Sequence, residues 1–104
     1  MNGKPVVAFD VVRDDVQAAY DYFAERAHAG GEPFLERYFG ITDRIASNPW
    51  LFPVKFDDYH RALVPKSYFA IYYFQEPLRS VIVAVVDARR DPRLIRDLIR
   101  GRRG

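Results

Sequence analysis

Apolar residues follow strand-like and then helix-like spacing along the first half of the chain. Residues 6–12 are rich in β-branched side chains at period two, which predicts a strand. Residues 16–27 and 33–46 each carry one apolar stripe at helical spacing. The capping signals are Asp14 or Asp15 before the first helix, Gly30-Gly31 after it and Pro33 at the start of the second. Two amphipathic helices joined this closely predict an antiparallel helical hairpin.

Strand-sized apolar runs dominate the second half. They cover residues 60–64, 68–74 and 80–87, with connections short enough for hairpin turns. The last two runs are apolar on both faces, which predicts central strands. Residues 50–59 show no regular pattern and are predicted to form a loop.

A short helix is predicted at the end of the chain, over residues 92–100. Asp91 is placed to cap it and Pro92 to open it. Four aliphatic residues share one face, and Arg93, Arg96 and Arg100 lie on the other. Gly101 is expected to end the helix and residues 102–104 to fray.

The element order is strand, helix, helix, three strands, helix. This order predicts a single α+β domain over residues 1–104, in two layers. The expected sheet has four strands and is mainly antiparallel, with the helical hairpin on one face and the short C-terminal helix elsewhere. A hydrophobic fraction of 49% argues against disorder. No apolar run reaches membrane-spanning length and no secretory signal is visible, so we expect a cytoplasmic protein without a membrane partner.

Charge is distributed unevenly along the chain. Residues 1–88 hold nine Lys or Arg and twelve Asp or Glu, whereas residues 89–104 hold seven Arg and two Asp. A basic end on a mildly acidic body suggests an anionic partner, either nucleic acid or an acidic protein segment. A solubilising tail is the alternative.

Familiar catalytic signatures are absent from the sequence. The chain has no cysteine, which excludes disulfides, zinc–thiolate sites and thiol catalysis. It has no glycine-rich phosphate loop, no zinc-binding HExxH and no GxSxG elbow, so we expect neither a cofactor nor a metal. Of the two histidines, His28 at a helix end needs no functional explanation, whereas His60 beside Arg61 is a candidate base. The pair Asp57-Asp58 is expected to make turn hydrogen bonds.

The sharpest chemical signal is Arg89-Arg90 at the end of a buried strand. The arginine guanidinium makes bidentate hydrogen bonds to phosphate or carboxylate groups. A residue at the end of a strand is held in place by the sheet. Arg61, with His60, Lys66 and Tyr68, could share that surface and form a patch of cations and one phenol. The alternative is that these arginines pair with the neighbouring acids Asp57, Asp58, Asp87 and Asp91. A one-residue shift of register would exchange Arg89 and Arg90 on the surface.

Segments 60–73 and 81–92 together resemble the signature of the RelE/ParE toxins of type II toxin–antitoxin (plasmid stabilisation) modules. The shared features are an arginine opening a strand, a basic and aromatic turn, a tyrosine-rich apolar strand, and an aliphatic strand ending in Arg-Arg-Asp-Pro. Upstream, residues 45–49 (Ile-Ala-Ser-Asn-Pro) are similar to the end of the family's second helix. The resemblance implies a growth-inhibiting toxin neutralised by a cognate antitoxin in a hetero-oligomer.

Two branches of the family differ in target. The resemblance implies either a ParE-like toxin that binds DNA gyrase or a RelE-like mRNA interferase that cleaves mRNA on the ribosome. Arg61 and Arg89 or Arg90 fall where the ribonucleases carry phosphate-holding arginines, with His60, Lys66 and Tyr68 as further candidates. Three features depart from the nuclease pattern: Asp87-Ala88 replace a frequent histidine, Lys55 is the one cation in the preceding loop, and neither tyrosine nor histidine follows Arg90.

These departures leave no convincing general base, which favours the ParE-like reading. An mRNA interferase and a non-toxic binding domain of the same fold remain alternatives. Because antitoxin tails are commonly acidic and amphipathic, Arg93, Arg96 and Arg100 and the open sheet face are the expected antitoxin contacts. Simple packing of the last helix, with its arginines in solvent, is the competing interpretation.

Overall fold

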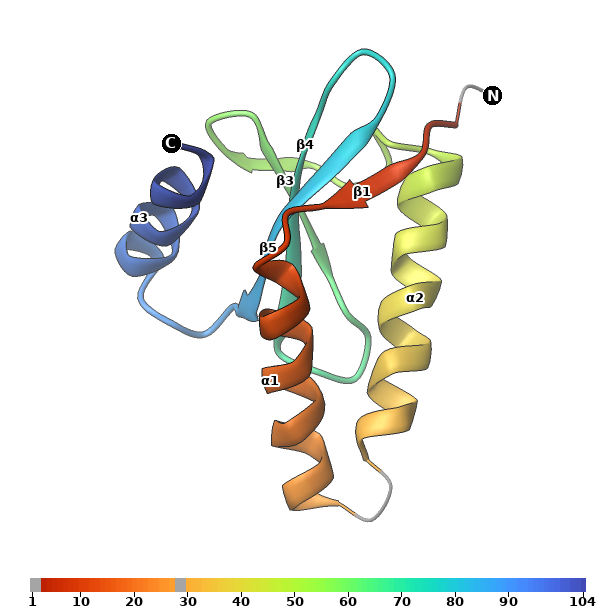
Figure 1. Ribbon diagram of the computed structural model, residues 1–104, viewed down its shortest axis with the longest axis vertical. Coiled ribbons are helices and arrows are strands. Elements are labelled where there is room, and N and C mark those ends of the chain that lie inside the picture. Colours follow the sequence, from red (N-terminus) through yellow and green to blue (C-terminus); the bar gives the residue numbers. More distant parts are fainter. Residues whose placement is uncertain (1–2, 28–29) are drawn as a thin grey trace.

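The computed structural model describes residues 3–27 and 30–104 (Figure 1). Across these residues the chain forms three helices and five strands. In chain order they are β1 (Val6–Ala8), α1 (Val12–Arg26), α2 (Gly31–Ser47), β2 (Val54–Phe56), β3 (Tyr59–Leu63), β4 (Phe69–Gln75), β5 (Ser80–Asp87) and α3 (Pro92–Arg103). The α+β class predicted from the sequence is confirmed. Within the described part of the chain, no helix is both long and apolar enough to cross a membrane.

The strands form one mixed sheet in the order β1-β5-β4-β3-β2. The two strands predicted to be central, β4 and β5, lie at its middle, where both of their apolar faces are covered. β1 pairs with β5 in parallel, and the other neighbours are antiparallel. The predicted four-stranded sheet is therefore wrong in its strand number, since β2 adds a fifth strand.

β2 lies within the segment predicted as a loop. It pairs with β3 through a tight turn at Asp57-Asp58, where Asp57 adopts the left-handed region with φ of 48°. A strand of three residues is too short to show a period-two pattern, and aspartate is one of the residues that tolerate such a turn. β2 is recognised as a strand by its backbone pairing with β3, and its own sequence shows no strand pattern.

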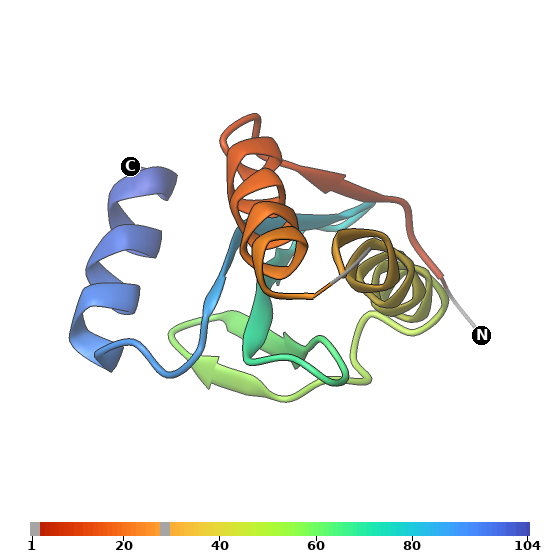
Figure 2. The same cartoon turned by 90° about the horizontal axis from the view of Figure 1, so that it is seen from below.

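The helical hairpin covers one face of the sheet, with α1 and α2 side by side (Figures 1 and 2). Its core contains buried side chains of both helices and of three strands, among them Phe34, Ile45, Ile71 and Tyr73. The predicted cap at Asp14 or Asp15 is wrong, because α1 already begins at Val12 and has no side-chain cap. At the start of α2, an added Cβ on Gly31 would come within 2.6 Å of the Tyr20 ring, so the helices approach more closely there than a side chain permits.

α3 packs on the opposite face of the sheet, so the predicted two layers with one open face are wrong, and helices cover both faces. Ile95 and Ile99 join a second core cluster with apolar side chains of β4 and β5. The expected end at Gly101 and the expected fraying of residues 102–104 are wrong, since α3 continues to Arg103. The reason is that the last two arginines are bound to the body of the protein.

Arg102 forms a nearly buried ion pair with Asp15 of α1. Its guanidinium nitrogens lie 2.6 and 2.8 Å from the Asp15 carboxylate, and one also donates to the Val83 carbonyl at 3.0 Å. Asp15 in turn accepts the Val85 amide at 2.9 Å. β1 pairs with β5 only as far as Ile82, and beyond that residue α1 and α3 supply these hydrogen bonds to β5. The pair therefore joins α1, β5 and α3.

The phenol of Tyr73 is buried in the core beneath the helical hairpin. Its side chain is 0% exposed and its hydroxyl donates to the Pro49 carbonyl at 2.8 Å. Burial raises the pKa of this phenol to about 12, above the value of 10.0 that it has in the unfolded chain. Above pH 10 the tyrosine of the unfolded chain loses its proton before that of the folded protein, which favours unfolding. The contribution of the protonated Tyr73 phenol to the free energy of unfolding is therefore complete below pH 10 and is lost as the pH rises through about 12.

Tyr73→Phe is therefore expected to lower the free energy of unfolding by about 1 kcal/mol at neutral pH, through the lost hydrogen bond. Urea titrations of both proteins between neutral pH and about pH 11 measure the difference, which should shrink as the pH rises. A difference that stays constant over this range would contradict the expected burial of the phenol.

Candidate functional site

A cleft opens between α1 and the turn joining β3 to β4, beside the end of β5. It has a volume of about 380 Å³, and we call it the cation–aromatic cleft. Its lining residues are Tyr22, Phe23, Lys66, Ser67, Tyr68, Phe69 and Arg89. Three residues singled out from the sequence, Lys66, Tyr68 and Arg89, thus line one hollow.

The β3–β4 turn positions two of these side chains. Lys66 adopts the left-handed region with φ of 58°, as the third residue of a turn that begins Val64-Pro65 requires. The Ser67 hydroxyl donates to the Val64 carbonyl at 2.7 Å and accepts the Phe69 amide at 3.1 Å. These bonds fix the turn and hold Lys66 at the rim of the cleft.

Arg89 is anchored just beyond the end of β5. The Asp87 carboxylate accepts the Arg89 amide at 2.9 Å and its guanidinium at 3.1 and 2.7 Å. This contact lowers the pKa of Asp87, and it raises the pKa of Arg89. The guanidinium carbon also lies 4.0 Å from the centre of the Tyr68 ring. Arg89 therefore presents a permanent charge on a ring that is 59% exposed.

Aromatic rings from α1 and β4 form the wall of the cleft. Tyr22 and Phe69 contact edge to face with centres 5.7 Å apart, and Phe23 lies 5.9 Å from Phe69. Arg26 covers the outer face of Tyr22 at 3.7 Å. An aromatic wall beside Lys66 and Arg89 suits a partner that combines negative charge with a flat or apolar group.

Arg61 does not share this cleft. On β3, Ala62 and Val64 belong to the core beneath the helical hairpin, so Arg61 and Leu63 point to the other face of the sheet. Arg61 instead lines a separate hollow of about 340 Å³ with Lys55 and Leu63. The predicted common platform for Arg61 and Arg89 is therefore wrong, because side chains alternate along a strand.

His60 lies in the interior and is 3% exposed. Its ring stacks on Tyr73 with centres 4.7 Å apart. Nδ1 lies 2.7 Å from the Phe52 carbonyl oxygen, and Nε2 lies 3.2 Å from the side-chain nitrogen of Gln75. Both ring nitrogens are thus engaged, and the residue stabilises the core edge rather than facing a cleft. The other histidine, His28, lies outside the described residues.

The remaining arginines are used in different ways. Arg90 is exposed beyond the strand end and does not line the cation–aromatic cleft. Arg93 contacts Asp91 at 3.3 Å, whereas Arg100 binds Asp57 through two bonds of 2.9 and 3.1 Å. Arg103 pairs with Asp58 and covers the Phe74 ring at 3.7 Å. Of the pairing expected between the strand-end arginines and four nearby acids, the structure therefore shows Arg89 with Asp87, whereas Asp57, Asp58 and Asp91 bind arginines of α3.

Tyr22 is the cleft residue that the sequence analysis missed. It lies on α1 beside, rather than within, the apolar stripe that defines the helix, and its chain distance from Lys66 and Arg89 gives no local signal. Two tyrosine hydroxyls and a serine hydroxyl therefore accompany the two cations.

Within the described residues, no cluster of histidines and carboxylates is arranged to hold a metal ion. The groups that line the cation–aromatic cleft offer positive charge, hydroxyl groups and aromatic rings. Comparison with models of known protein families gives no match for this chain, and a search of curated protein sequences gives none either.

Proposed function

We propose that the chain is a growth-inhibiting toxin of a RelE/ParE-like type II toxin–antitoxin module that acts by binding a target protein, DNA gyrase. The observation that carries the proposal is the cation–aromatic cleft. It is built from the segments that resemble the family, since Lys66 and Tyr68 come from one and Arg89 from the other. β3, β4 and β5 are neighbours in the sheet, so these segments form one continuous part of the molecule.

Target binding is favoured over RNA cleavage by the state of the ionisable groups. Strand cleavage needs a base within hydrogen-bond reach of the attacking hydroxyl. Asp87, the carboxylate paired with the cleft residue Arg89, is held in its charged form by this contact, which also makes it a weak base. His60 is buried with both ring nitrogens engaged. A rigid cation on an aromatic ring suits recognition of a protein surface instead.

An mRNA interferase is the second candidate. Stacking of a base on Tyr68 and contact of a phosphate with Lys66 and Arg89 are compatible with the cleft. The resemblance to the ribonucleases implies phosphate contacts by Arg61 and by Arg89 or Arg90. Of these arginines, only Arg89 lines the cation–aromatic cleft.

The antitoxin is proposed to present an acidic segment to α3. Arg96 has no ion-pair partner among the described residues, and Arg93 has a single exposed contact with Asp91, so both are available. Arg100 already donates from Nε and Nη2 to the two carboxylate oxygens of Asp57. An acidic partner therefore gains more from Arg93 and Arg96 than from Arg100.

Inducible expression in a bacterial host tests the proposal. We expect growth arrest with DNA-damage signalling, and inhibition of DNA supercoiling by gyrase when the purified protein is added. Growth arrest with cleavage of translated mRNA would replace gyrase binding by interferase activity. Normal growth at high expression would overturn the toxin proposal and leave a binding domain of the same fold.

A further inference from the structure

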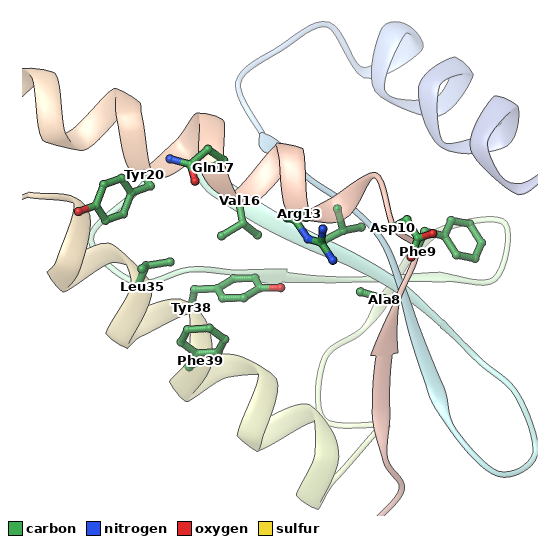
Figure 3. A pocket seen from close by; sticks show the side chains of 11 residues that line it. Ala8, Phe9, Asp10, Arg13, Val16, Gln17, Tyr20, Leu35, Tyr38 and Phe39 are labelled. Atoms are coloured by element: carbon green, nitrogen blue, oxygen red, sulfur yellow. The ribbon is translucent and has the colours of Figure 1, made fainter.

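A second hollow of about 440 Å³ lies between α1, α2 and the end of β1 (Figure 3). Its walls are mostly apolar. They are formed chiefly by Ala8, Phe9, Val12, Val16, Leu35 and Phe39. Phe39 is 56% exposed, so its ring stands at the mouth of the hollow, in contact with solvent. This volume falls within the range of small-molecule sites.

The polar groups that extend into this hollow include two hydrogen-bond donors without an internal partner. Arg13 and Tyr38 both point into it (Figure 3). Among residues 3–27 and 30–104, no carboxylate lies within ion-pair distance of Arg13, and Asp15, two residues away, is bound to Arg102. Tyr38 is only 6% exposed, and no described residue accepts its hydroxyl proton.

The Tyr38 ring is buried, whereas its hydroxyl faces the open hollow, where it is free to donate to a bound acceptor. Burial, with a smaller effect from the Asp15 charge, raises the pKa of Tyr38, so the phenol keeps its proton and stays a donor. The hollow is also fixed in shape at one end. There Tyr20 of α1 donates to Glu32 of α2 at 2.9 Å and ties the two helices together.

We propose that this hollow is a binding site for a small organic acid with an apolar body. The carboxylate pairs with Arg13 and accepts the Tyr38 hydroxyl proton, and the body packs against Val16, Leu35 and Phe39. The Arg13 cation and the neutral Tyr38 hydroxyl both donate hydrogen bonds, so together they favour a negatively charged group that accepts them. The proposal is independent of the toxin function, because the hollow shares no residue with the cation–aromatic cleft.

Asp10 also lines the hollow, at the end nearer β1. Its charge opposes an anion, and no ion pair joins it to Arg13. Asp10→Asn is therefore expected to tighten binding of a carboxylate by a few-fold, whereas loss of Arg13 weakens it.

The probe is 3-phenylpropanoate, and its neutral amide, 3-phenylpropanamide, is the matched control. The two differ in charge while keeping the same apolar body. Titrations followed by amide chemical shifts of the full chain should show saturable binding of the acid, with shifts at α1 and α2. Binding of the amide should be at least about tenfold weaker, because it lacks the charge-assisted contact.

Substitutions separate the two donors from general packing. Arg13→Gln should weaken binding of the acid about tenfold or more, and Tyr38→Phe by a smaller factor. Arg26→Gln removes an arginine on the same helix outside the hollow and should leave binding unchanged. Backbone shifts of each variant show that the fold is retained.

Equal binding of acid and amide would overturn the proposal, as would Arg13→Gln binding the acid like the unchanged protein. The proposal would also be overturned if 3-phenylpropanoate did not saturate the protein at concentrations up to about 10 mM. Such weak binding corresponds to less free energy than one good ion pair in an apolar site supplies. None of these results bears on growth inhibition, so this proposal and the toxin proposal fail separately.

Discussion

Replacing Asp15 by alanine is expected to lower the free energy of unfolding by about 3 kcal/mol, because it leaves the Arg102 guanidinium charged and unpaired in a nearly dry site. The side chains of Arg102 and Asp15 are 15% and 11% exposed. The Val85 amide loses its acceptor in the same change. Urea denaturation monitored by tryptophan fluorescence or circular dichroism measures the loss.

Asp14→Ala is the matched control for this experiment. It removes an exposed carboxylate from the same first turn of α1, and therefore the same favourable interaction with the helix dipole. We expect it to cost no more than about 0.5 kcal/mol. Equal destabilisation by the two substitutions would show that helix electrostatics, and not the pair with Arg102, accounts for the effect.

Replacing Lys66 and Arg89 together by glutamine is expected to abolish the growth inhibition that we propose for this chain. Removal of one partner of a desolvated charge pair at an interface costs about 2–5 kcal/mol, so the double change weakens target binding by about 30-fold or more. The fold should survive, because the Arg89 pair with Asp87 is exposed and such pairs contribute about 0–1 kcal/mol. Colony counts after induction, with protein level and thermal unfolding measured in parallel, give the result.

A double variant outside the cation–aromatic cleft provides the comparison. Lys55→Gln with Arg79→Gln removes one lysine and one arginine, and neither residue lines the cation–aromatic cleft. Growth inhibition should persist in this variant. Inhibition lost by the Lys55 and Arg79 changes but kept by the Lys66 and Arg89 changes would move the target-binding surface to the hollow that contains Arg61.

The sequence predicts the middle of the sheet well and its edges poorly. β4 and β5 are apolar on both faces, a pattern that only a central position in a covered sheet explains, and they lie at the centre. β2 has three residues and acquires its identity from pairing with β3. β1 pairs in parallel with β5 at the edge of the four antiparallel strands β2 to β5, across more than seventy residues of sequence that no local pattern connects.

The candidate site was predictable to a similar degree. Lys66 and Tyr68 are close in sequence to a turn, and Arg89 follows a strand that was expected to lie next to it, so their proximity follows from the hairpins. Arg61 was assigned to the same surface, yet side-chain alternation places it on the opposite face. Tyr22 enters the cleft from a helix, a placement that depends on how the hairpin lies on the sheet.

The sequence by itself determined the α+β class, the helical hairpin and the two central strands, because apolar periodicity is a local property of the chain. The tertiary structure alone decided which charges remain available. Arg89, Arg100, Arg102 and Arg103 each contact an acid, and for the last three that acid lies more than forty residues away in the sequence. An ion pair depends on the distance between two side chains, which is fixed only when the helices and strands have packed.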